Sequence, residues 1–473
     1  MVVALTVGMS NNHSLPRRGF LAGAASLAGL GAATTAQAKA ALPSDFIFSD
    51  LRGSLNASTI GVRPGVLDNQ SALFQEAVDA AATHGQPLFL EAGDYLVSNI
   101  DLRSGVTIVG VPGRTRIRYA GDGHLFFASG VTDVRLQGLV IDGANRLLAD
   151  YAPAIIHIST GANIAIEDCS ILGSIKDGIV LDRVSGRVER TTISGARSAA
   201  LVSNEAEGLA IRNNVVADCA DNGILVHRWQ NGRDGTLVTG NRISRIRAAS
   251  GGTGPFGNAI NFFRADDVIA TGNIIDDCDF SAIRCNACSN VQVSNNTCTN
   301  LGEVAVFVEF SFQGAVVSNN IVDGAARGIS VTNFNDGGRL GVVQGNLIRN
   351  LVSAARLPTD DPVQGIGIGV EADTTVIGNV VEDATYAGIT VGWGPYLRNV
   401  IASQNIVRRA PMGVAVSVVD GVGQAVVSDN MFSGTPDGAV VGMRWLDRAT
   451  GDLTQTRDVP APLTVERNRS LGV

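Results

Sequence analysis

Lysine is nearly absent from this chain of 473 residues, which contains Lys39 and Lys176 and otherwise carries its positive charge on arginine. Schiff-base chemistry needs a lysine amine, so it has one candidate, Lys176, in the folded body. Charged residues make up 17% of the chain, against about 25% in an average soluble protein. The formal net charge is −8. Because nucleic-acid binders need a basic surface, we expect no nucleic-acid partner.

Aromatic residues, at 5%, and long apolar runs are also scarce. Beyond residue 40 no apolar stretch approaches the roughly 18 residues of a membrane-spanning helix, so we expect the processed protein to be soluble. Hydrophobic residues nevertheless reach 45%, and glycine is common, at 56 residues. This composition suits a large folded core and is not that of a disordered, collagenous or coiled-coil chain.

The N-terminus has the pattern of an export signal. Arg17 and Arg18 precede an apolar run rich in alanine and glycine, which ends in Ala-Gln-Ala at residues 36–38. Such an order is typical of a secretory signal, and the arginine pair resembles a twin-arginine signal. A membrane anchor is disfavoured because the run is short. We predict a signal peptide over residues 1–38, contact with the twin-arginine translocase, and a periplasmic or secreted protein without a membrane span. Cleavage leaves 34 basic and 44 acidic residues, a net charge of −10.

An internal repeat dominates the rest of the chain. Short strands of alternating apolar and polar residues end in asparagine at intervals of 23–33 residues. This alternation is typical of β-strands with one buried face, and asparagine or glycine supplies the left-handed backbone of a tight corner. The recurring amides are able to stack into a ladder in which each bonds the next coil. They are Asn214, Asn241, Asn273, Asn296, Asn320, Asn346, Asn379, Asn405 and Asn430.

A second half-repeat of the type Gly-Ile-x-Val starts at Gly178, Gly223, Gly328 and Gly388. A unit of about 25 residues with three short strands cannot bury its own apolar face, but stacked units can. Leucine-rich repeats need a regular leucine frame, which is missing, and a propeller blade needs about 40 residues. The pattern therefore predicts an all-β chain, a single-stranded right-handed parallel β-helix over residues 111–445.

Both ends of the stack are expected to be capped, because a naked strand edge invites association. The sequence from Asp68 to Ser71 is a helix start signal, and apolar residues at helical spacing follow up to Ala81. We therefore assign residues 39–110 to an N-terminal cap, where the chain enters the first coils. Residues 446–473 are less apolar and are assigned to a C-terminal cap or tail.

A capping helix followed by short coils resembles the N-terminal part of the pectate-lyase-like superfamily. Together with the export signal, the chain resembles the twin-arginine-translocated β-helix-repeat proteins of bacteria, a family without established chemistry. The resemblance covers most of residues 45–445 at the level of the fold. It implies the usual activities of the superfamily, namely cleaving, epimerising or binding acidic polysaccharide, although a fold does not fix a function. An acidic polysaccharide is therefore the expected partner.

Aligning the Gly-Ile-x-Val strands predicts which side chains point outward from one sheet, in two columns. The first column is predicted to be Val180, Leu201, Leu225, Asn261, Arg284, Phe307, Ser330, Gly369 and Thr390. The second is predicted to be Asp182, Ser203, His227, Phe263, Asn286, Glu309, Thr332, Glu371 and Gly392. Two insertions, 247–257 and 352–364, precede the same sheet and are placed to wall a groove.

The middle coils gather charged and aromatic side chains, whereas the flanking coils carry small or apolar residues. The alternative interpretation is an ordinary solvated sheet face. We select as catalytic candidates His227, Arg284, Glu309 and Glu371. We select as substrate-binding candidates Asn261, Phe263, Arg264, Trp229, Asn333 and Trp393.

Glu309 and Glu371 are expected two coils apart, roughly 10 Å at the backbone for a coil spacing of about 4.8 Å. Their carboxyl groups are then able to reach the roughly 6.5–9.5 Å of an inverting glycosidase, one as acid and one as base. A lyase or epimerase instead needs a cation to neutralise the uronate, a base for the C5 proton and an acid for the leaving group. Arg284 or Arg264 suits the first role, and His227, about three coils from Glu309, suits either of the others.

Sequence motifs typical of several branches of the pectate-lyase-like superfamily are missing from this chain. The chain has neither Gly-His-Gly, a mark of polygalacturonases, nor Asp-Pro-His-Asp, a mark of alginate epimerases. The columns hold no dense aspartate cluster, so a calcium site is not supported, and no metal site or cofactor is required by the sequence. Export permits disulfides, and a metal remains possible, but the cysteine spacings match no zinc pattern, which favours stacked interior thiols. The cysteines are Cys169, Cys219, Cys278, Cys285, Cys288 and Cys298.

Three classes of function follow. The first is an exported polysaccharide lyase, epimerase or hydrolase with its groove on one parallel sheet. The second is a non-catalytic carbohydrate-binding or cell-envelope β-helix protein, in which removal of His227 or Glu309 would leave binding intact. The third is a cofactor-carrying protein, which metal analysis and an absorption spectrum would reveal.

Overall fold

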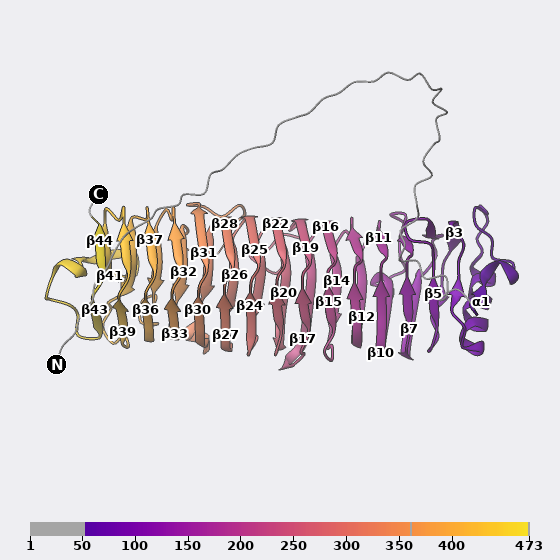
Figure 1. The fold of residues 1–473 in the computed structure, drawn as a ribbon, viewed down its shortest axis with the longest axis horizontal. Helices are drawn as coiled ribbons and strands as arrows, with labels where there is room; N and C mark the ends of the chain where they lie inside the picture. Colours follow the sequence, from indigo (N-terminus) through magenta and orange to yellow (C-terminus); the bar gives the residue numbers. More distant parts are fainter. Residues whose placement is uncertain (1–52, 360–361, 472–473) are drawn as a thin grey trace, which may run out of the picture. The chain divides into compact units, whose positions relative to one another are not determined.

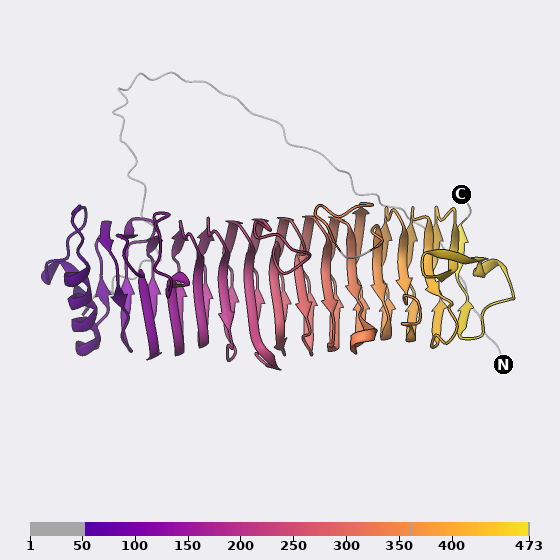
Figure 2. The same cartoon turned by 180° about the vertical axis from the view of Figure 1, so that it is seen from behind.

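A computed structural model describes residues 53–359 and 362–471, all within one compact unit, Ser49–Val473. The signal peptide predicted for residues 1–38 lies outside the described residues. The unit confirms the predicted fold: short parallel strands wind into a right-handed β-helix whose coils stack along one axis (Figure 1). The same coils seen from behind form an unbroken series from α1 (Ser71–His84) to the last strands (Figure 2).

Each coil contributes strands to three ladders. The first and second ladders belong to one sheet, and the second runs from β1 (Leu55–Asn56) to β43 (Leu463–Glu466). The third ladder forms a separate 15-stranded sheet, from β3 (Gly93–Val97) to β44 (Arg469–Leu471). The first ladder carries the site described below. Its strands are β4 (Ile100–Asp101), β7 (Phe126–Thr132), β10 (Ala154–Glu167), β12 (Asp177–Glu189), β14 (Ala199–Asn204), β17 (Asn222–Arg233), β20 (Asn258–Asp266), β23 (Ile283–Asn286), β26 (Val304–Glu309), β29 (Arg327–Val331), β32 (Ile366–Val370), β35 (Ala387–Val391), β38 (Met412–Ser417) and β41 (Gly438–Arg444).

The inward side chains of all three ladders form one continuous apolar core of valine, isoleucine, leucine and alanine. All six cysteines are buried and none is in a disulfide. Burial raises the pKa of Cys169, Cys219 and Cys298 to about 12. These thiols are therefore protonated at neutral pH and pack as small apolar groups.

The predicted asparagine ladder is present and longer than expected. Each amide oxygen accepts from the backbone N–H and the Nδ2 of the preceding asparagine, and each Nδ2 also donates to a backbone carbonyl of a preceding coil. Asn320, for example, accepts from Asn296 Nδ2 at 3.0 Å and donates to Asn346 Oδ1 at 3.0 Å and to Val293 O at 3.0 Å. The ladder runs without a break from Asn214 to Asn468.

The N-terminal end is covered by the predicted helix. Asn69 Oδ1 accepts from the backbone N–H of Ser71 at 2.8 Å. Gly85 follows the last residue of α1, and its φ of 63° is the left-handed conformation that glycine tolerates. The apolar stripe of α1, which includes Phe74 and Val78, is fully buried. In the described part of the chain, no helix is both long and apolar enough to cross a bilayer.

At the other end, residues 446–471 include one further coil of the stack. β43 pairs in parallel with β39 (Ala425–Ser428), and β44 pairs with β40 (Met431–Ser433). Before that coil, β42 (Asp447–Asp452) folds back antiparallel on β41. This hairpin covers the exposed edge of the first ladder.

The ladder predicts a stability effect. Replacing Asn320 by alanine removes its amide and leaves the buried groups of Asn296 and Asn346 without partners. We expect the free energy of unfolding to fall by roughly 2–4 kcal/mol, measured by urea denaturation. Gln292→Ala, which removes an exposed carboxamide of the neighbouring coil, serves as the control and should change it by less than about 0.5 kcal/mol. Equal effects of the two substitutions would contradict this role of the ladder.

Candidate functional site

Pairing register defines the two outward columns of the first ladder. The first column runs Asp101, Phe127, His157, Val180, Val202, Leu225, Asn261, Arg284, Phe307, Ser330, Gly369, Thr390, Ala415 and Val441. The second column lies two residues later on each strand and includes Asp182, Asn204, His227, Phe263, Asn286 and Glu309. Glu309 ends β26 and Glu371 directly follows β32. The coil of β29, which carries Thr332, lies between them, so the two glutamates are two coils apart, as predicted.

One coil was predicted out of register. Leu201 pairs with Ile179 and is fully buried, and Ser203 is also buried. The outward residues of β14 are Val202 and Asn204. This strand lacks the Gly-Ile-x-Val pattern on which the alignment relied, and a shift of one residue moves a strand's side chains to the opposite face.

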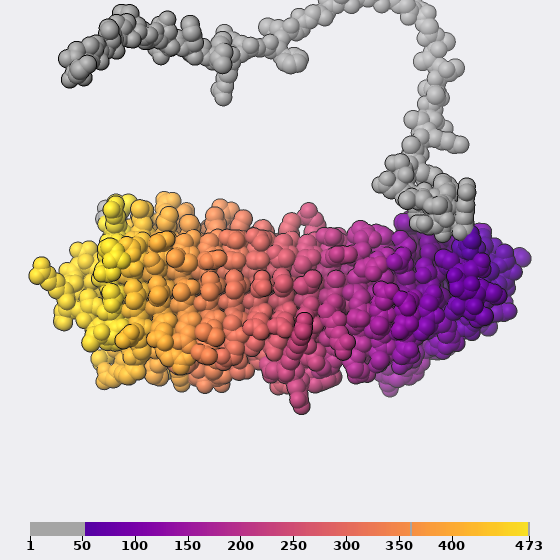
Figure 3. All heavy atoms as spheres, turned by 60° about the horizontal axis from the view of Figure 1, so that its bottom comes forward, coloured from indigo at the N-terminus to yellow at the C-terminus, as the bar shows by residue number. Residues whose placement is uncertain are grey.

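Two adjoining cavities occupy the outer face of this ladder, with volumes of about 560 Å³ and about 300 Å³. We call them the large pocket and the small pocket, and together the groove. Thr332 and Asn333 line both, so the pockets meet there. Both insertions contribute to the walls, as predicted: Thr253–Phe256 and Thr359 line the large pocket, and Pro362 and Val363 line the small one. Figure 3 shows the side chains of successive coils in rows along the β-helix axis.

The large pocket contains a buried ion pair. Arg284 Nε donates to Glu309 Oε1 at 2.6 Å, and Asn286 Nδ2 donates to the same oxygen at 2.8 Å. Arg284 is 9% exposed and Glu309 is 3% exposed. Both donors favour the ionised carboxylate. Because its charge is already compensated, Arg284 is not the free cation that the sequence suggested for a uronate.

Two polar atoms of this pocket have no hydrogen-bond partner in the structure. Arg284 Nη1 and Asn261 Oδ1 are both buried and unpaired. A Cβ atom on Gly254 would lie 1.7 Å from Arg284 Nη1, so the 247–257 insertion packs directly on the guanidinium. An unpaired buried donor beside an unpaired acceptor suits the hydroxyl groups of a sugar.

Glu371, which is 7% exposed, lines the small pocket. Its Oε2 accepts from the backbone N–H of Phe334 at 2.6 Å, at the start of the short helix η3 (Phe334–Asp336). Asn333, in the left-handed conformation with φ 71°, makes the turn into this helix. Its Oδ1 accepts from Phe310 N at 3.3 Å. The turn thus places Asn333 between the two pockets.

His227 faces the large pocket among aromatic rings. Its ring lies 4.6 Å from that of Trp229 and 5.1 Å from that of Phe263, measured between centroids. Burial lowers the pKa of His227 below 6.5, the nearby Arg264 lowers it further, and Glu205 opposes both. The imidazole is therefore neutral at pH 7, which suits a base.

Two predicted substrate-binding residues lie beside the groove. Trp229 is 63% exposed, and Arg264 Nη1 donates to its backbone carbonyl at 2.7 Å. The Arg264 guanidinium lies 4.8 Å from the Phe263 ring centroid. Neither Trp229 nor Arg264 lines either pocket among the described residues, whereas Asn261, Phe263 and Asn333 line the large one.

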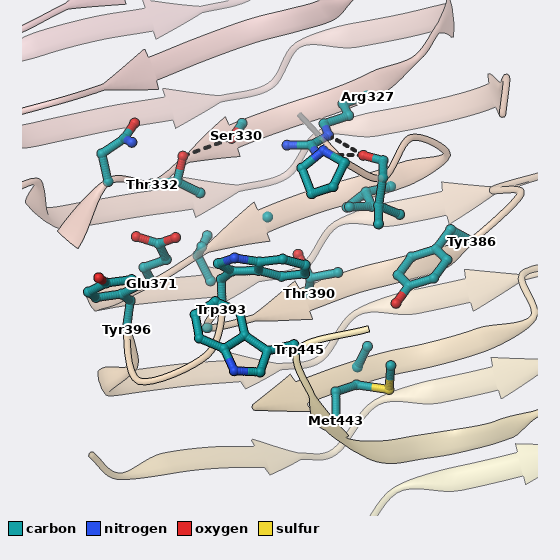
Figure 4. A pocket seen from close by; sticks show the side chains of 18 of the residues that line it. Arg327, Ser330, Thr332, Glu371, Tyr386, Thr390, Trp393, Tyr396, Met443 and Trp445 are labelled. Carbon is teal, nitrogen blue, oxygen red and sulfur yellow. Dashed lines mark hydrogen bonds between the residues drawn. The ribbon is translucent and has the colours of Figure 1, made fainter. Parts of the chain in front are cut away.

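Aromatic side chains close the small pocket (Figure 4). The predicted Trp393 lies edge-on to Trp445, with ring centroids 5.5 Å apart, and Tyr386 and Tyr396 complete the lining. The sequence analysis did not select Trp445, Tyr386 or Tyr396. Trp445 lies in the hairpin at the C-terminal end, outside the repeat pattern, so no alignment of strands was able to place it.

A second polar cluster lies on the same face toward the N-terminus. His157 Nε2 is 2.8 Å from Asp182 Oδ2, and Asn204 Nδ2 donates to Asp182 Oδ1 at 2.6 Å. Burial raises the pKa of Asp182, but these hydrogen bonds outweigh it and the net shift is downward. His124 Nδ1 lies 3.2 Å from the Tyr151 hydroxyl. Among the described residues, no group of three or more His, Cys, Asp or Glu side chains is arranged to hold a metal ion.

Comparisons with known proteins agree with the fold. Residues 177–338 match the family described as "Right handed beta helix region". No curated protein sequence matches the chain significantly.

Several solved structures are similar. The bacteriophage Phi29 gene product 12 N-terminal fragment has a TM-score of 0.55 at 16% identity, covering 88% of this chain and 71% of its own. The catalytic unit of a GH87 alpha-1,3-glucanase from Streptomyces thermodiastaticus has a TM-score of 0.50 at 15% identity, covering 89% and 69%. The alginate lyase AlyF-OU02, in complex with G6, has a TM-score of 0.50 at 14% identity, covering 80% and 85%. At such identities the likeness shows the β-helix fold.

The surroundings of His227 predict opposite effects of two substitutions. Arg264→Gln removes a nearby positive charge and should raise the pKa of His227 toward its ordinary value. Glu205→Gln removes the opposing negative charge and should lower it further. Both shifts are measurable by NMR titration of histidine-labelled protein, against Glu382→Gln on the third ladder as a control. Shifts in one direction for both variants would contradict the assignment.

Proposed function

We propose that this protein is a carbohydrate-active β-helix protein that hydrolyses a polysaccharide bound in the groove. The observation that carries the proposal is the placement of two buried carboxylates, Glu309 and Glu371, on one column at the junction of the two pockets. Their coil separation corresponds to roughly 10 Å at the backbone, which leaves room for a water molecule beside the scissile bond. Two similarly folded proteins are by name an alpha-1,3-glucanase and an alginate lyase, which supports activity on a carbohydrate.

The contacts suggest how the two carboxylates divide the work. Glu309, held by Arg284 and Asn286, suits the base that takes a proton from water, while the water oxygen bonds to the anomeric carbon. Glu371 then donates its proton to the glycosidic oxygen as the carbon–oxygen bond breaks. Glu309 ends β26 and Glu371 directly follows β32, and both strands pair with β29, which keeps the separation of the two carboxyl groups fixed.

Charge in the groove favours a neutral polymer over the acidic one expected from the resemblance. The charged lining residues are two arginines, Arg284 and Arg327, against three glutamates, Glu303, Glu309 and Glu371. His227 adds no charge at pH 7. With Glu371 protonated as the proposed acid, the two arginines are balanced by Glu303 and Glu309, so the described lining offers no excess positive charge to hold a polyuronate.

A lyase is the second candidate, and the neutral state of His227 favours it. A neutral imidazole facing the large pocket is able to take the C5 proton of a uronate. The product of that reaction is an unsaturated sugar, which absorbs ultraviolet light, whereas hydrolysis produces reducing ends without it. The two reactions are therefore distinguishable in one assay.

We predict that the purified protein releases reducing ends from a neutral member of a polysaccharide panel, without ultraviolet absorbance. Glu309→Gln and Glu371→Gln should each lower kcat by at least about 100-fold, because acid and base catalysis contribute about 10²–10⁴ each. Glu382→Gln, on the third ladder, should retain full activity.

Other outcomes have defined meanings. Ultraviolet absorbance that is lost in His227→Ala would replace the hydrolase with the lyase. Binding of a polysaccharide without cleavage, unchanged in Glu309→Gln, would leave only a carbohydrate-binding protein.

We also propose that residues 1–38 direct export through the twin-arginine translocase. The support is the arginine pair followed by a short apolar run and a small-residue cleavage site. Expressed in a bacterium, the full chain should appear in the periplasm shortened at its N-terminus. Replacing both Arg17 and Arg18 by lysine should retain it in the cytoplasm at full length. Export of the double variant would contradict this route.

A further inference from the structure

The face that carries the groove is long on one side of the two carboxylates and short on the other. Counting along the first column from the coil of Glu309, eight coils precede it, from Arg284 back to Asp101. After the coil of Glu371 only three residues remain, Thr390, Ala415 and Val441. At about 4.8 Å per coil, the N-terminal side extends roughly 38 Å beyond Glu309.

The short side ends in a wall. β42 folds back on β41, and the turn between them places Trp445 with φ 56°. Trp445 lies edge-on to Trp393 at an interplanar angle of 81°. A Cβ atom on Gly394 would lie 2.3 Å from the Trp445 ring, so the ring rests directly on the glycine backbone.

The turn beneath Trp445 is held firmly. Trp393 and Tyr396 exchange backbone hydrogen bonds of 3.2 and 3.0 Å. Ser417 Oγ, which is buried, donates to Gly394 O at 2.6 Å. These hydrogen bonds hold the turn from Trp393 to Tyr396, and the Trp445 ring packs on that turn. We therefore do not expect a bound polymer chain to displace the ring.

The small pocket extends from the coil of Ser330 to this wall, and Glu371 lines it. Its lining of Trp393, Trp445, Tyr386 and Tyr396 offers ring faces on which the apolar faces of sugars pack. Its volume of about 300 Å³ is about half that of the large pocket, at about 560 Å³. Figure 4 shows both tryptophans projecting into it opposite Arg327.

We propose that the small pocket receives one end of a neutral polysaccharide and that Trp445 sets this preference, so that the protein cleaves from chain ends and not at internal bonds. This inference rests on the proposed hydrolysis between Glu309 and Glu371. The remainder of the polymer lies over the large pocket and the coils toward β4. The terminal unit is released from the small pocket after each cleavage.

The test follows the lengths of all released products, by chromatography and mass spectrometry, on a neutral polysaccharide that the wild-type protein cleaves. We expect one short product from the earliest time points, with reducing ends rising while the viscosity of the polymer solution barely changes. Trp445→Gly keeps the left-handed backbone of the turn and removes the ring. It should yield a mixture of product lengths and a rapid loss of viscosity.

Leu446→Ala is the matched control, because Leu446 is exposed in the same turn and does not line the pocket. It should keep the single product. A ladder of products from the wild-type protein would overturn end recognition and leave the hydrolase standing. No cleavage of any polymer would overturn both. A single product from folded Trp445→Gly would overturn the role of Trp445, and the wild-type product pattern decides the question even if that variant fails to fold.

Discussion

The stacking of one coil on the next at a fixed register is the constraint on which the rest of this structure depends. Backbone pairing in three ladders sets the spacing, and the buried asparagine ladder from Asn214 to Asn468 bonds each coil to its neighbours. Each amide satisfies backbone groups at a corner where the strands cannot pair. A shift of one coil by one residue would reverse its inward and outward faces, so the same register positions both the core and the site.

The site arises where the repeat is interrupted. Regular coils give a nearly flat outer face, and the insertions at 247–257 and 352–364 raise walls over it. The hairpin β41–β42 interrupts the stack again and supplies Trp445. Repeat proteins commonly place such insertions on one face, because the core tolerates additions at corners far better than within strands.

Pairing between neighbouring coils also changes the meaning of individual residues. Arg284 viewed alone is a cation available to a uronate, but its Nε is bonded to Glu309 from the next coil. His227 viewed alone titrates near neutrality, but burial and Arg264 favour its neutral form. The first contact removes a cation available to a uronate and so favours the proposed neutral substrate. The neutral imidazole of His227 instead supports the alternative reaction, elimination.

The sequence alone determined the fold, because alternation recurs along the chain, asparagine recurs at regular spacing from Asn214 onward, and neither needs long-range information. It also placed Glu309 and Glu371 on one column, since strand alignment predicts outward positions. It misplaced β14, where the pattern is absent. Only the tertiary structure decided which arginine is neutralised, that Trp229 and Arg264 lie beside the pockets, and that Trp445 closes one end. Those outcomes depend on contacts between coils and insertions of irregular length, which no period in the sequence encodes.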